Sequence, residues 1–169
     1  QIEGAQGKIP FILENGDIEI IIDKDSINKS KVSGTYNNDE FVKFNEELLK
    51  IQKGLIDFQK KNTPAMTQAQ QANDTAVINK LMGEYNKLQE GVNTESKKKY
   101  NGYAETHPKS FITALIIQGM TGDPSVDVKN IEKLFSGLDE SLKTTKPGKA
   151  IAEKIKALIG VQPQSPSFE

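Results

Sequence analysis

The sequence predicts an α+β fold, in which a small antiparallel β-sheet is followed by a bundle of about five helices that includes a long helical hairpin. Residues 11–22 are rich in apolar and β-branched side chains and are interrupted by Asn15-Gly16. From residue 38 onward, apolar residues recur three and four positions apart, the spacing of an amphipathic helix. We therefore expect strands only in the N-terminal third of the chain.

The N-terminal segment contains a hairpin signal. Asn-Gly between two apolar runs is typical of a two-residue type I′ turn, and both central residues of that turn need a positive φ. With Asn15 and Gly16 as the loop, Leu13 faces Ile18 and Phe11 faces Ile20 on one side of the sheet. Another short strand is expected near residues 31–34. Because so few strands are rarely stable alone, we expect helices to cover this sheet and earlier strands to have been cut away.

Two long helices are expected next, and they should form an antiparallel hairpin. The first should begin at Asn37 or Asn38 and end near residue 61, because Asn62-Thr63-Pro64 favours a break. Residues 65–73 are compatible with either a helical extension or a loop. The second helix should run from about residue 77 to residue 103. The apolar stripes of the two helices are Phe41, Phe44, Leu48, Ile51, Leu55 and Phe58, and Val77, Leu81, Tyr85, Leu88 and Val92.

Proline and glycine residues set the expected limits of the later helices. Thr106 or His107 should cap a helix with Pro108 at its first position, and its apolar run 111–117 should be the most buried. Further helices should start at Asp123-Pro124 and near Pro147. Gly160 should end the last helix, and Pro163 and Pro166 should prevent it from resuming.

The composition excludes several classes of function. The 23 acidic residues nearly cancel the 22 basic ones, all of which are Lys, whereas nucleic-acid binding needs a basic excess. The chain has no Cys, so it can form neither a thiolate zinc site nor a dithiol active site. His107 is the only His, and its position before Pro108 is typical of a helix start. No catalytic, metal or cofactor site is predicted.

Several segments in order resemble one protein family. They are Gly7-Lys8-Ile9-Pro10-Phe11-Ile12-Leu13-Glu14-Asn15-Gly16, Val32-Ser33-Gly34-Thr35-Tyr36-Asn37-Asn38, the helical hairpin, His107-Pro108-Lys109-Ser110-Phe111, Pro147-Gly148-Lys149 and Gly160 with Ser165-Pro166-Ser167-Phe168. This series resembles the N-terminal region of two-domain thiol-disulfide oxidoreductases of the Gram-negative cell envelope. In that family, a domain of unknown function precedes a thioredoxin-like domain.

The resemblance implies that residues 1–36 are the end of a truncated β-sandwich. It also implies a helical region over residues 37–160 and, over residues 161–169, a linker and the start of an absent thioredoxin-like domain. It implies a periplasmic parent protein, attached to a membrane only through an anchor outside this chain. The module itself would be non-catalytic and would position the redox domain, mediate homodimerisation or bind client proteins. The alternative is a free-standing helical protein whose hairpin groove holds a peptide or small ligand.

Overall fold

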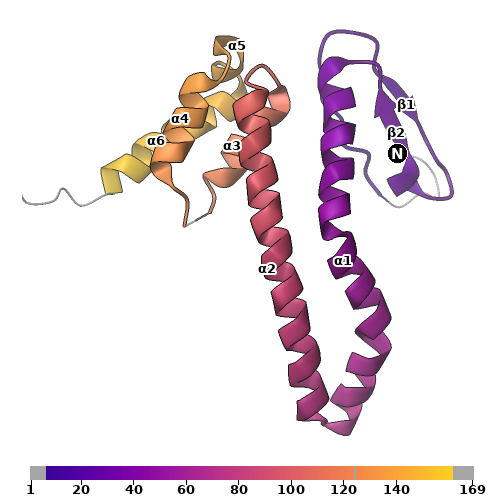
Figure 1. The fold of residues 1–169 in the computed structure, drawn as a ribbon. Helices are drawn as coiled ribbons and strands as arrows, with labels where there is room; N and C mark the ends of the chain where they lie inside the picture. Colours follow the sequence, from indigo (N-terminus) through magenta and orange to yellow (C-terminus); the bar gives the residue numbers. More distant parts are fainter. Residues whose placement is uncertain (1–6, 124, 162–169) are drawn as a thin grey trace, which may run out of the picture. The chain divides into compact units, whose positions relative to one another are not determined.

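The computed structural model describes residues 7–123 and 125–161. Two strands and a short 3₁₀ helix precede six α-helices, so the α+β class with a helical bundle is confirmed (Figure 1). The chain divides into two compact units, one ending at Lys99 and the other beginning at Tyr100. Within the described residues, no helix combines the length and hydropathy needed to cross a membrane.

The first unit contains an antiparallel β-hairpin, but not at the predicted turn. Strand β1 (Glu19–Ile21) pairs antiparallel with β2 (Lys31–Ser33), and Ile20 lies opposite Val32. Residues 22–30, with the 3₁₀ helix η1 (Ile27–Lys29), connect them. The strand expected near residues 31–34 is therefore confirmed, but residues 11–13 form no strand and the pairing across Asn15-Gly16 is wrong.

The side chain of Asn38, rather than a neighbouring strand, binds the backbone of Ile12. Asn38 is 0% exposed. Its side-chain amide forms hydrogen bonds with both the N–H and the carbonyl of Ile12. The Ile12 N–H donates to Asn38 Oδ1 at 2.8 Å, and Asn38 Nδ2 donates to the Ile12 carbonyl at 2.8 Å and to Thr35 Oγ1 at 2.7 Å. One side chain thus replaces a ladder partner and fixes the N-terminal segment to helix α1 (Tyr36–Ala72).

The Asn15-Gly16 pair serves a different turn from the one predicted. Gly16 has φ +128°, but Asn15 does not have a positive φ, so the type I′ geometry is absent. A Cβ on Gly16 would lie 2.9 Å from Thr35 Cγ2. Gly16 therefore lets this turn approach the start of α1.

The Glu14 carboxylate binds the same end of α1. Its oxygens accept from the Asn37 N–H at 2.9 Å and from Asn37 Nδ2 at 2.7 Å. Partial burial raises the pKa of Glu14, but hydrogen bonds from Thr35 and from Asn37 outweigh it and hold that pKa below its usual range. A carboxylate here also faces the positive end of the helix dipole.

This pKa shift predicts an acid-dependent loss of stability. A lowered pKa means that Glu14 contributes stability fully above the pKa it has in the unfolded chain, about 4.3, and loses it as pH falls through the folded value. We expect Glu14→Gln to be less stable than the wild type at pH 7 and the difference to disappear on acidification. Urea unfolding of both proteins from pH 7 to pH 3 measures this. A difference that stays constant over that range would contradict the role of the ionised carboxylate.

Helix α1 is longer than predicted and contains Pro64. The Thr63 hydroxyl donates to the Gln59 carbonyl at 2.6 Å, and Asn62 Nδ2 donates to the Phe58 carbonyl at 2.9 Å. The helix continues to Ala72 and ends at Asn73, which has φ +53°. Residues 65–72 are therefore helical, and the predicted break at residues 62–64 is wrong.

The predicted antiparallel hairpin is formed by α1 and helix α2 (Thr75–Thr106) (Figure 1). Asn73 and Asp74 connect the two helices, and the Asp74 carboxylate accepts from the Val77 N–H at 3.1 Å. The buried apolar residues of this first unit are Ile12, Val32, Phe44, Leu55, Ala69 and Leu81.

The second unit is a compact helical cluster. Helix α3 (Phe111–Met120) packs against α4 (Val128–Gly137), α5 (Glu140–Lys143) and α6 (Lys146–Val161). Ile117, Ile131 and Ile151 are each 0% exposed. The prediction of a buried run at residues 111–117 is confirmed for Ile112, Thr113, Ala114, Ile116 and Ile117, whereas Leu115 is 37% exposed.

Three predicted helix limits in this unit are wrong. Ser110, not Thr106 or His107, caps α3: its Oγ accepts from the Ile112 N–H at 3.2 Å, and Pro108 lies in the preceding turn. Asp127 caps α4, because its carboxylate accepts from the N–H groups of residues 129 and 130. Helix α6 includes Gly160 and reaches Val161, so Gly160 does not end it.

Candidate functional site

The candidate site is a groove between α1 and α2 within the first unit. It consists of two hollows, which share Phe58. The inner hollow, nearer the Asn73–Asp74 turn, has a volume of about 360 Å³, and the outer hollow has a volume of about 660 Å³. The inner hollow is lined by Phe58, Gln59, Asn62, Thr63, Met66, Thr67, Gln70, Leu81, Met82 and Tyr85. The outer hollow is lined by Ile51, Gly54, Leu55, Phe58, Glu84, Lys87, Leu88, Gly91, Val92 and Glu95.

The walls of the groove follow from the two apolar stripes. Leu55 and Leu81 are buried, but Leu88 is 38% exposed and Met82 is 44% exposed. Helix α1 therefore leaves part of the apolar side of α2 open to solvent. Volumes of this size lie within the range of sites that bind small molecules or anchor side chains of a peptide.

The two hollows differ in charge. Apart from Tyr85, no side chain lining the inner hollow is ionisable, and its polar groups are amides and hydroxyls. The outer hollow carries Glu84, Lys87 and Glu95, all from α2, whereas its α1 wall is uncharged. A hydrogen bond of 3.5 Å from Gln59 Nε2 to Tyr85 Oη spans the two helices. Methionine and neutral amides suit binding of varied apolar groups.

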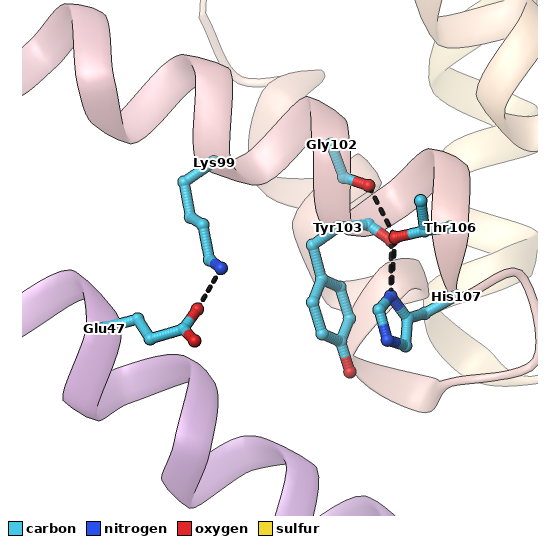
Figure 2. A network of polar contacts seen from close by, with 6 residues as sticks. All are labelled: Glu47, Lys99, Gly102, Tyr103, Thr106 and His107. Atoms are coloured by element: carbon cyan, nitrogen blue, oxygen red, sulfur yellow. Dashed lines mark hydrogen bonds and ion pairs between the residues drawn. The ribbon is translucent and has the colours of Figure 1, made fainter.

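Beyond the outer hollow, an ion pair between Glu47 and Lys99 joins α1 to α2 (Figure 2). The hydrogen bond from Lys99 lowers the pKa of Glu47 below its usual range, and the charges of Lys99 and Lys50 add to this effect. The groove is therefore bounded by the Asn73–Asp74 turn at one end and by this ion pair at the other.

A second polar cluster lies in the other unit, around His107. The ring of His107 stacks on that of Tyr103, with centroids 4.2 Å apart and planes 4° from parallel. Its Nδ1 lies 2.8 Å from Thr106 Oγ1, which donates to the Gly102 carbonyl at 2.7 Å (Figure 2). Tyr103 Oη lies 3.0 Å from Ser110 Oγ. Since Ser110 is 0% exposed and caps α3, this hydroxyl pair is inaccessible to a substrate.

The predicted site residues do not form a common site. Asn15 and Gly16 lie in a turn of the first unit, and Pro108 and Gly160 lie in the second, while Pro163 and Pro166 fall outside the described residues. In the described ranges, no group of three His, Asp or Glu side chains is placed to hold a metal ion.

Sequence reasoning missed part of the groove. Met66, Thr67 and Gln70 line the inner hollow, in a segment for which the sequence is compatible with either a helical extension or a loop. The Ala and Gln residues of 65–72 are good helix formers and were the available signal.

Comparisons with known proteins give one partial match. No curated protein and no solved structure matches the chain. Residues 1–41, which contain the Asn38 and Glu14 contacts but none of the groove, match a family described as a domain of unknown function (DUF4369).

Proposed function

We propose that this chain is a non-catalytic module of an envelope thiol-disulfide oxidoreductase, and that its helical hairpin binds apolar segments of client proteins. The observation that carries the binding role is the open groove between α1 and α2, with its exposed Leu88 and Met82. The series of motifs described above supports the oxidoreductase parent and its periplasmic location. The groove itself requires neither.

The chemistry of the groove favours binding over catalysis. Neither hollow is lined by a His, Ser or Cys, and the two carboxylates of the outer hollow come from α2 alone. Apolar walls can bury an apolar segment of a client away from water, and they do so without requiring a fixed pattern of hydrogen bonds. Such a site suits partly unfolded proteins, which expose side chains that a folded protein buries.

Binding to an unfolded protein with blocked thiols tests this function. We expect the chain to bind reduced, carboxymethylated α-lactalbumin, as measured by fluorescence anisotropy. Leu88→Glu and Met82→Glu should each weaken binding by about tenfold or more, because each places a charge in an apolar contact. Leu49→Glu is the matched control, since Leu49 is 57% exposed on α1 and lines neither hollow.

Equal binding by all three variants would refute the proposal that the groove is the binding site. Thermal unfolding must show that each variant remains folded. The oxidoreductase parent is tested separately by reading the coding sequence downstream of Glu169. A Cys-x-x-Cys motif there supports it, whereas a stop codon favours a free-standing binding protein. Because the chain has no Cys, we expect it not to reduce insulin disulfides by itself.

A further inference from the structure

Two glycines line the outer hollow, and no close contact within the described structure requires them. Gly54 lies inside α1 and Gly91 inside α2. A Cβ built on either would meet no atom within 4 Å beyond its own helix backbone. Glycine inside a helix is unfavourable relative to alanine, because it loses more backbone freedom on folding. These two positions therefore cost helix stability without relieving a steric conflict.

We propose that the outer hollow binds an amphipathic α-helix of a partner polypeptide, and that the backbone of this helix lies close to Gly54 and Gly91. A missing Cβ lets another backbone approach a helix closely, which gives both glycines a purpose that the free chain lacks. This inference rests on the proposed function, because it specifies the conformation of the segment that the groove binds.

The walls of the hollow favour a helix over an extended segment. Both walls are helices, whose interior N–H and C=O groups bond within their own helix. The remaining lining is largely aliphatic and aromatic. An extended segment would bury backbone groups that find no partner here, whereas a helix satisfies its own. Helix-in-groove binding, with an apolar stripe as the anchor, is the mode that fits.

The charges of the hollow specify the flank of that helix. The α2 wall presents two carboxylates, Glu84 and Glu95, and one ammonium group, Lys87, while the α1 wall presents no charge. A helix with Lys or Arg along one side of its apolar stripe can place those groups against α2 and its stripe against Ile51 and Leu55. The partner is thus an apolar helix with a basic flank on one side.

A designed peptide tests the proposal. The probe is a fluorescein-labelled 18-residue helix of Leu, Ala and Lys, with Lys along one flank of its Leu/Ala stripe. One comparison peptide has Glu in place of Lys, and another has two central residues replaced by Pro, which prevents the helix. Anisotropy titration with the full chain measures binding, and the urea midpoint measures stability.

The glycine variants give two opposite readouts. Gly54→Ala and Gly91→Ala should each raise the urea midpoint of the free chain yet weaken binding of the Lys-flanked peptide by about tenfold. Gly83→Ala is the matched control: Gly83 lies inside α2, a Cβ there also meets no atom within 4 Å, and it does not line the hollow. It should raise the midpoint without changing binding. Glu84→Lys should weaken binding of the Lys-flanked peptide and strengthen that of the Glu-flanked one.

Each of the following outcomes would contradict one part of the proposal. If the Pro-containing peptide binds as well as the helical one, the helical partner is wrong and the proposed function stands. If Gly54→Ala and Gly91→Ala bind like the wild type, the close backbone approach is wrong. If the chain binds neither these peptides nor carboxymethylated α-lactalbumin, both proposals fail. Self-association of the free chain that Gly54→Ala abolishes, detected by sedimentation, would make a second copy the occupant and overturn the partner helix.

Discussion

Asn38→Ala is expected to lower the free energy of unfolding by about 2–4 kcal/mol, because it leaves two buried backbone groups of Ile12 without partners. Urea unfolding followed by circular dichroism measures the loss. Hydrogen exchange at the Ile12 N–H gives a local readout, since that N–H donates to Asn38 Oδ1. Asn38→Asp keeps an acceptor for the N–H but loses the donor to the carbonyl, so it should not restore wild-type stability.

The matched control for this prediction is Asn37→Ala. Asn37 is the neighbouring residue, and its side chain binds the Glu14 carboxylate in a partly exposed position. Its loss should cost less than that of Asn38, because solvent can replace the missing partner. Equal losses for the two variants, or unchanged exchange at Ile12 in Asn38→Ala, would refute the role of Asn38 as a replacement ladder partner.

Gly148→Ala should destabilise the second unit by about 2–4 kcal/mol, since overpacking against a backbone is difficult to relieve. Gly148 lies in the first turn of α6 and is buried. A Cβ on it would lie 2.6 Å from the carbonyl oxygen of Lys143 and would also collide with that of Leu142. To make room, α6 would have to move away from α5. Thermal unfolding of the full chain measures the loss.

Gly137→Ala provides the control for this steric effect. Gly137 is the last residue of α4, and a Cβ there would meet no atom within 4 Å. Its replacement should be neutral or slightly stabilising. If Gly148→Ala unfolds at the same temperature as the wild type, the close packing of α5 against the start of α6 is wrong.

The sequence predicted the helices better than the strands, and Asn38 shows why. Helical periodicity is a local signal, so the stripes of α1 and α2 and the buried run of α3 could be found from spacing alone. The backbone of Ile12, in contrast, is bound by a side chain 26 positions later in the chain. A contact at that separation leaves no local pattern, and it overrode the hairpin signal of Asn15-Gly16.

Pro64 illustrates a second limit of local rules. A proline inside a helix removes one hydrogen bond and costs about 3 kcal/mol or more, which favours a break. Here the helix continues for eight residues beyond it, through good helix formers, and buries Ala69. The inner hollow depends on this continuation, because Met66, Thr67 and Gln70 follow the proline. Individual groove residues could thus be predicted from the stripes, but not the extent of the groove.

Because Asn73–Asp74 is a short connection, a rotation of one helix about this turn moves a residue further the more distant it lies from the turn. At 1.5 Å per residue, Met66 lies about 10 Å along α1 from the turn and Gly54 about 28 Å. A rotation of about 5° at the turn would shift Met66 by about 1 Å and Gly54 by about 2.5 Å. Such a rotation would therefore change the width of the outer hollow more than that of the inner hollow. Because the Glu47–Lys99 ion pair is partly exposed, salt weakens it, and we expect a rise in ionic strength to widen the outer hollow more than the inner one.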